Sequence, residues 1–204
     1  MMEGLSTTTG EYLHNIYKKN PSEKSLQKMI DAVPSSLSYK YKEGQLPIQT
    51  AVCCGCDFIS LPYITFLAIE GVKHNVGGAN KRGGLLFEDP FHAERDNVLQ
   101  MLADFQKKPN SEPYDSACFN VLKGLTESNL FFKKDVQDYD LLLLSCSTAR
   151  QLRFEHLAQT NPEGLQLHRY DGRPIIHAMI NARDTSESFQ LFLSTALATG
   201  APSR

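Results

Sequence analysis

Several features that would narrow the function of this protein are scarce or absent in its 204 residues. No apolar run approaches the roughly 20 residues that a membrane-spanning helix needs. The N-terminal segment lacks the apolar core of a secretory signal peptide. Five cysteines, an odd number, do not suggest a disulfide framework. We therefore expect a cytoplasmic or nuclear protein with reduced thiols and no membrane partner.

An excess of charge of one sign is also missing. The chain has 21 Lys and Arg against 23 Asp and Glu, a formal net charge of −2. Its basic residues form no stripe interleaved with aromatics, so we expect no nucleic-acid partner. A hydrophobic content of 41% and a charged content of 22% are typical of a globular chain with a substantial core.

What the chain does contain is one stretch that occurs twice. Residues 34–51, PSSLSYKYKEGQLPIQTA, are echoed by residues 162–178, PEGLQLHRYDGRPIIHA. A proline, a leucine and a glycine recur 128 residues later, and both copies place a Pro-Ile pair at the start of an apolar run. Self-similarity of this kind predicts a repeat architecture.

Helical periodicity predominates along the chain and strand patterns are scarce. Five longer segments carry apolar residues on one helical face: 25–37, 60–68, 118–125, 150–158 and 189–196. Five shorter segments are more uniformly apolar, as helices buried on most sides are: 12–19, 47–56, 98–105, 141–146 and 174–181. We expect Ser60 to cap its helix, with Pro62 in the first turn. The pattern predicts about five helix–turn–helix units in an all-α protein.

The spacing of the shorter helices is uneven. Their first residues are separated by 35, 51, 43 and 33 residues. We attribute the two wide steps to insertions at about 72–96 and 107–116. The first is rich in glycine, and we expect Gly71 to end the helix before it. The second, KKPNSEPYDS, is typical of a flexible loop.

These motifs resemble the ankyrin repeat family, whose signature sets a turn glycine before T-P-L-H-x-A. The best match is residues 44–51, GQLPIQTA, in which the proline and the final alanine fit. Leu46 replaces the threonine that caps the helix, and Gln49 replaces the histidine that bonds neighbouring backbone. We expect Gln49, and Gln100 in a poorer copy, to replace part of that bonding. Nothing obvious replaces the capping threonine.

The chain also resembles the divergent, insertion-bearing ankyrin-like proteins of unicellular algae, which carry a similar glycine-rich insertion. The resemblance implies an all-α, ankyrin-like helix–turn–helix repeat solenoid of about five divergent repeats with two loop insertions. It places a flexible N-terminus at 1–10, a single repeat domain at 11–198 and a C-terminal tail at 199–204.

The glycine-rich insertion, residues 71–89, contains the G-x-x-x-x-G skeleton of a phosphate loop at 78–83. Gly84 and Leu85 follow where a phosphate loop needs lysine and then serine or threonine. We interpret the stretch as an inserted loop with a β-hairpin through Leu85 to Glu88. Four basic residues leave weak anion binding open: Lys73, His74, Lys81 and Arg82.

Cysteine and histidine do not form a recognisable centre. Cys53, Cys54 and Cys56 include one C-x-x-C, but no second ligand pair accompanies it, so we interpret them as buried thiols. His156 and His177 belong to no nucleophile or metalloprotease motif and are expected to be partly buried or to bond turns. We expect no enzyme activity, no metal and no cofactor.

The resemblance implies a non-catalytic protein–protein interaction module, a scaffold or adaptor, here a monomer. Its partner, another protein, would contact the fingers between repeats and the concave face of the inner helices. Tyr and Arg are common at interface hot spots. The predicted partner-binding residues are Tyr39, Tyr41, Lys42, Gln45, His168, Arg169, Tyr170 and Arg173. The alternative is a small α-helical ligand-binding protein or enzyme that uses residues 71–89.

Overall fold

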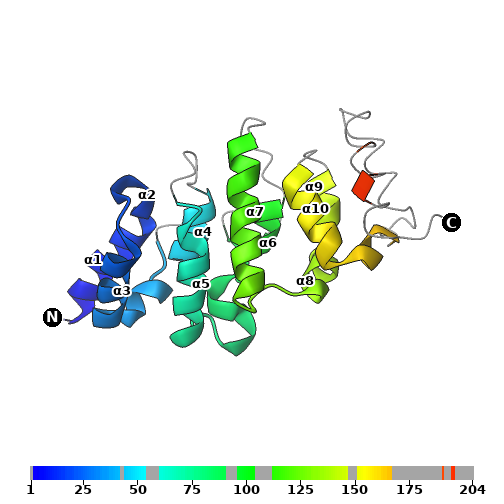
Figure 1. Ribbon diagram of the computed structural model, residues 1–204. Helices are drawn as coiled ribbons and strands as arrows, with labels where there is room; N and C mark the ends of the chain where they lie inside the picture. The colour runs from blue at the N-terminus through cyan, green and yellow to red at the C-terminus, as the bar shows by residue number, and fades with distance from the viewer. Residues whose placement is uncertain are drawn as a thin grey trace. The chain divides into compact units, whose positions relative to one another are not determined.

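The computed structural model describes residues 2–41, 44–53, 60–90, 96–103, 112–146, 151–166, 190 and 194–195 (Figure 1). Within these ranges all regular structure is helical and no strand occurs, which confirms the all-α prediction. The chain divides into two compact units, Met1–Met101 and Leu102–Arg204. None of the described helices has the length and apolar character to cross a membrane.

The first unit contains the first copy of the repeated stretch, residues 34–51, and the glycine-rich insertion. Its elements are α1 (Met2–His14), α2 (Ile16–Lys19), α3 (Glu23–Ala32), the 3-10 helix η1 (Pro34–Ser38), α4 (Pro47–Cys53), α5 (Tyr63–Lys73), the 3-10 helix η2 (Ala79–Gly84) and the start of α6 (Val98–Ala103). Helix α1 packs on α4, α3 packs on α5, and α4 packs on α5. Contacts between neighbouring helices therefore run through the unit from α1 to α4, from α4 to α5 and from α5 to α3.

Apolar side chains of these helices meet in one core. Leu26 and Ile30, one turn apart on α3, are fully buried, as are Leu13 of α1 and Ile64 of α5. Burial of an aliphatic side chain contributes about 1.5–3 kcal/mol, so this core is the main source of stability in the first unit.

The N-terminal segment is helical from Met2 onward, where a flexible terminus was expected up to residue 10. Gly10 is buried, and a Cβ atom built on it would lie 2.3 Å from the Tyr39 ring. The predicted helix at 12–19 therefore begins ten residues earlier than expected, and the packing of Gly10 on Tyr39 is a distant contact that helps to hold this added part of α1.

The glycine-rich insertion is packed against α5. Gly71 lies inside α5, so our prediction that it ends the helix is wrong. A Cβ atom on Gly71 would lie 2.4 Å from the carbonyl oxygen of Gly83, and one on Gly83 would lie 2.3 Å from that of Ala68. Only glycine permits two backbones to come this close, and Gly83 also has a positive φ of 67°. The glycines thus serve backbone packing.

The predicted β-hairpin at residues 85–88 is also wrong. A 3-10 helix precedes this stretch, Leu85 and Leu86 form a turn, and residues 87–89 have no regular structure. Both leucines are buried, with exposed fractions of 0% and 8%. Burial of consecutive leucines in a turn removes the alternation that a strand of a hairpin requires.

Two glutamines form the backbone hydrogen bonds that we predicted for them at the starts of α4 and α6. Gln49 Oε1 accepts the Leu46 N–H at 2.8 Å, and Gln100 Oε1 accepts the Asn97 N–H at 3.0 Å. The glutamine prediction is confirmed at both helices. Asn97 Oδ1 accepts the N–H groups of Leu99 and Gln100, so α6 has a side-chain cap that we did not predict.

Ser60 does not cap α5 with its side chain. Its hydroxyl instead donates to the Ala51 carbonyl at 2.6 Å, and the residue before α5, Pro62, makes no side-chain cap. The prediction is wrong because the fully buried hydroxyl bonds the C-terminal part of α4.

The second unit continues with short and long helices. Its further elements are α7 (Glu112–Glu127), α8 (Lys133–Asp138), α9 (Leu141–Cys146), α10 (Gln151–Thr160) and the 3-10 helix η3 (Pro162–Gln166). Helix α10 packs on α7 and on α9. Part of the expected 107–116 loop, residues 112–116, is the first turn of α7, where Glu112 and Asp115 favour a helix N-terminus. Helix α8 was not predicted.

A buried ion pair joins the helices of the second unit. Arg153 Nε donates to Asp115 Oδ1 at 2.7 Å, and its Nη1 donates to the carbonyls of Leu102 at 2.6 Å and Ala103 at 3.1 Å. Asp115 Oδ2 accepts the Leu152 N–H at 2.9 Å. Arg153 therefore connects the end of α6 to α7 and α10.

Candidate functional site

The first finger, residues 39–45, leads from η1 to α4; residues 42 and 43 lie outside the described part. The Tyr41 N–H donates to the Gln45 carbonyl at 3.0 Å, and the Gly44 N–H donates to the Tyr41 carbonyl at 2.7 Å. Gly44 has a φ of 82°, which a side chain would strain. These two bonds bring Gly44 and Gln45 back to the backbone of Tyr41.

His14 holds the first finger against α1 and α4. Its Nε2 donates to the Tyr39 carbonyl at 3.0 Å, because that oxygen can only accept, and its Nδ1 accepts from the Thr50 hydroxyl at 2.7 Å. The Tyr41 ring lies 5.1 Å from the imidazole, centroid to centroid. Burial lowers the pKa of His14, against the smaller opposing effects of the Tyr39 carbonyl and Glu11. His14 is thus neutral at pH 7 and serves as a structural connector.

Hydrogen bonds also join the finger to the end of the insertion. Gln45 Nε2 donates to Asp89 Oδ2 at 2.6 Å, and the Cys53 thiol donates to the same oxygen at 3.4 Å. Gln49 Nε2 donates to the Phe87 carbonyl at 2.9 Å. The Asp89 side chain is fully buried, so its carboxylate fixes the insertion to the finger and to α4.

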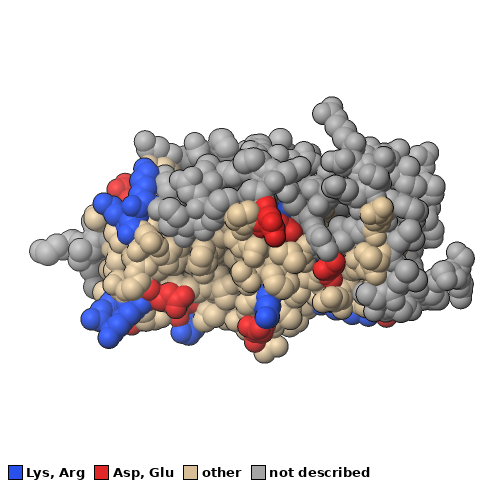
Figure 2. Space-filling model, turned by 45° about the horizontal axis from the view of Figure 1, so that its top comes forward, with Lys and Arg blue, Asp and Glu red and all other residues tan. Residues whose placement is uncertain are grey.

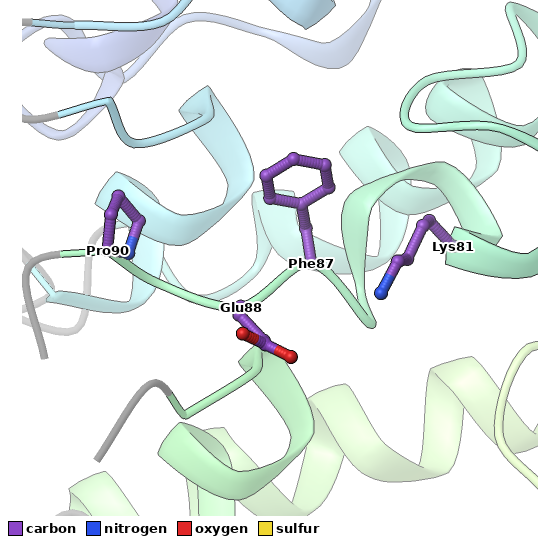
Figure 3. A pocket seen from close by; sticks show the side chains of 4 residues that line it. All are labelled: Lys81, Phe87, Glu88 and Pro90. Atoms are coloured by element: carbon purple, nitrogen blue, oxygen red, sulfur yellow. The ribbon is translucent and has the colours of Figure 1, made fainter.

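Beside this junction lies an open pocket of about 470 Å³, which we call the Phe87 pocket. It is lined by Lys81, Phe87, Glu88 and Pro90 (Figure 3). A Cβ atom on Gly44 would lie 3.3 Å from Pro90, so the pocket borders the first finger. In Figure 3 the Phe87 ring stands between Pro90 and Lys81, and the Glu88 carboxylate points away from the ring.

Two ammonium groups flank the Phe87 ring. Lys40 Nζ, from the finger, lies 5.1 Å from the ring centroid, and Lys81 Nζ, from η2, lies 6.0 Å from it. Lys81 also donates to the Leu86 carbonyl at 3.1 Å, which holds its side chain beside the ring. A cation at this distance from an aromatic face is attracted by about 0.5–1 kcal/mol at an exposed site.

The predicted partner-binding residues have different positions. Tyr39 and Tyr41 are half-buried against α1, and Lys42 lies outside the described residues. Gln45 is only 6% exposed and bonds Asp89, so its side chain does not belong to a contact surface. The second set, His168, Arg169, Tyr170 and Arg173, also lies outside the described residues. Sequence reasoning missed Lys40 and Pro90 and did not single out Phe87 within residues 71–89, because no periodicity links Lys40 to Phe87, 47 residues later.

The described cysteines and histidines considered for chemistry are buried or half-buried, and two of them form hydrogen bonds, Cys53 with Asp89 and His156 with Thr126. Cys118 is buried and Cys53 half-buried, while Cys54, Cys56 and His177 lie outside the described ranges. His156 is half-buried beside the Phe119 ring, at 5.5 Å between centroids. Among the described residues no group of His, Cys, Asp and Glu could hold a metal ion.

Charged residues of both signs are interspersed on the face drawn in Figure 2. On the face in Figure 2, Lys and Arg lie near Asp and Glu, with uncharged residues between the groups. On the insertion, Lys73 pairs with the buried Glu70 at 2.5 Å. Local arrangements such as the Phe87 pocket, rather than net charge, therefore distinguish one part of this surface from another.

Comparison of the chain with protein-family models, curated proteins and solved structures finds no match.

Proposed function

We propose that this protein is a non-catalytic module that binds another protein through the first finger and the Phe87 pocket. The observation that carries the proposal is the junction between them. Gln45, Gln49 and Cys53 bond the end of the insertion, so two segments distant in sequence form one preorganised surface. Preorganisation lowers the entropic cost of binding a partner.

The arrangement of the first unit supports an ankyrin-like array. Helix α1 packs on α4, and α3 packs on α5, so the helices before the first finger contact those after it. In a solenoid, each repeat buries its apolar face against its neighbours in this way. Fingers between repeats are then available to a partner.

The polar groups near the pocket form hydrogen bonds within the protein, which supports a binding role without catalysis. His14 bonds Tyr39 and Thr50, and the Asp89 carboxylate accepts bonds from Gln45 and Cys53. A general acid or base must reach the proton that it transfers, whereas these groups are buried under the finger.

Affinity capture with matched variants tests the proposal. We expect a protein retained by the wild-type chain to be lost with Lys40→Glu and kept with Lys24→Glu, an equal charge change on the exposed face of α3. The retained protein is then purified and titrated against all three chains. Equal binding by all three would remove the first finger from the proposal.

The volume of the Phe87 pocket supports a second candidate, a small-molecule site, because ligand pockets typically span about 300–1,000 Å³. A thermal-shift screen with nucleotides, metal ions and phosphorylated ligands separates the two candidates. A ligand at 100 times its Kd adds about 2.7 kcal/mol to the free energy of unfolding. The protein-binding proposal expects no such shift, and a large shift would favour the small-molecule site.

A further inference from the structure

The Phe87 pocket combines an apolar floor with positive charge at its rim. Phe87 is half-buried and Pro90 exposed, so both offer apolar surface to a bound group. The ammonium groups of Lys40 and Lys81 lie within 6.0 Å of the ring centroid. Lys40 is exposed and Lys81 half-buried, which leaves both charges at the edge of the pocket.

Two acidic residues follow Phe87 in the sequence, and neither carboxylate points at its ring. The Asp89 carboxylate is fully buried and accepts bonds from Gln45 and Cys53 beneath the finger. The Glu88 carboxylate points away from the Phe87 ring in Figure 3. Glu88 lines the same pocket, so a group that rests on the ring lies beside the two ammonium groups, on the side away from the Glu88 carboxylate.

The geometry points to an acidic peptide segment as the partner of this surface, with an aromatic or aliphatic side chain on Phe87 and Pro90 and flanking Asp or Glu carboxylates at Lys40 and Lys81. This inference rests on the proposed function and specifies its partner. Charge complementarity selects carboxylates, and the ring selects an adjacent apolar side chain.

The shape of the surface favours an extended peptide. Tyr41 is half-exposed on the finger whose Gly44 borders Pro90, so a segment that enters the pocket continues over the finger. Several residues of the peptide thus find contacts. A single small carboxylate would meet only the two lysines, and exposed ion pairs alone contribute about 1 kcal/mol or less each.

Selection from a displayed library of random 12-residue peptides tests the inference. The wild-type protein serves as bait, and enriched peptides are synthesised and titrated by fluorescence anisotropy. We expect enrichment of Asp and Glu next to Phe, Tyr, Trp or Leu. Lys40→Glu and Lys81→Gln should each raise Kd, the first by roughly five- to tenfold, since it turns an attraction into a repulsion. The control Lys24→Glu should change Kd less than twofold.

Some results would overturn only the acidic-peptide inference, and another would also count against the proposed function. Enriched peptides that are neutral or basic, that require a phosphate group, or that bind Lys40→Glu as tightly as the wild type would overturn the inference and leave a protein-binding module. A library with no peptide that binds the soluble protein would count against both. Circular dichroism of each variant confirms that altered binding is not due to unfolding, and an Lys40→Gln variant with an intermediate Kd supports the role of charge.

Discussion

The two units of this protein each contain a buried polar centre, and the centres differ in what they connect. In the second unit, Arg153 and Asp115 join three helices through a charged pair, and both side chains are almost entirely buried. In the first unit, Gln45 and Asp89 join two loops next to an open pocket. The helix-joining centre stabilises a fold, whereas the loop-joining centre also shapes a surface. The proposed function therefore lies at the second kind of centre.

The largest effect is expected when the charged centre is broken. Arg153→Met keeps much of the side-chain volume but leaves the Asp115 carboxylate buried without its cation. We expect the free energy of unfolding to fall by about 3–5 kcal/mol, measured by urea denaturation with hydrogen exchange at α10. Lys134→Met, whose exposed pair with Asp138 spans 3.7 Å, should cost less than about 1 kcal/mol. Equal effects of the two substitutions would contradict the structural role of Arg153.

A smaller loss is expected where the insertion packs on α5. Gly71→Ala would normally stabilise a helix by about 1 kcal/mol. Here the new methyl group would overlap the Gly83 backbone, so we expect a loss of about 1–3 kcal/mol instead. Val72→Ala, at a 45% exposed neighbouring position, is the control and should change little. A stabilising Gly71→Ala would show that the insertion does not pack on α5.

The hydrogen bond between Gln45 and Asp89 should contribute less to the free energy of unfolding than the pair of Arg153 and Asp115. Gln45→Ala leaves the buried Asp89 carboxylate with one fewer donor, so we expect a loss of about 1–3 kcal/mol by urea denaturation. Because the finger then loses its bond to the insertion, peptide binding should also weaken. A variant that loses stability but keeps full binding would separate the junction from the binding surface.

One histidine in each unit should give a small, pH-dependent effect of the same sign. Burial lowers the pKa of His14 in the first unit and of His156 in the second from the ordinary value of 6.5. The unfolded chain then binds more protons between the lowered pKa values and 6.5, so stability falls as pH falls through that window. NMR titration of the imidazoles checks this; a pKa above 6.5 for either would reverse the sign for its unit.

The helices were predictable because their signal is local. Apolar spacing predicted the starts of α4 at Pro47, α6 at Val98 and α9 at Leu141, each confirmed to the residue. The stacking of these helices into an ankyrin-like solenoid stays a proposal. The first ten residues of α1, before the predicted start at residue 12, and the 3-10 helix η2 escaped prediction. Residues of both contact distant segments, Gly10 at Tyr39 and Gly83 at Gly71, and such contacts are not visible in local periodicity.

The candidate site was predictable only in part. The sequence pointed to the first finger through its repeat motif, and to the insertion through its glycines, but as separate features. The finger and the insertion meet through the hydrogen bond between Gln45 and Asp89, which are 44 residues apart. They also meet where the Lys40 ammonium group lies over the Phe87 ring. Gln45 was assigned to the contact surface because it belongs to a finger of the ankyrin-like pattern, whereas its amide donates to the buried Asp89 carboxylate.

The central claim is that the first finger and the Phe87 pocket together bind a partner. Backbone amide NMR of the ¹⁵N-labelled full chain, titrated with a selected acidic peptide, tests it most directly. We expect the largest chemical-shift changes at Lys40, Tyr41, Lys81, Phe87 and Glu88, with little change at α10. Shifts concentrated on α7 and α10, with the finger and the pocket unchanged, would contradict the account.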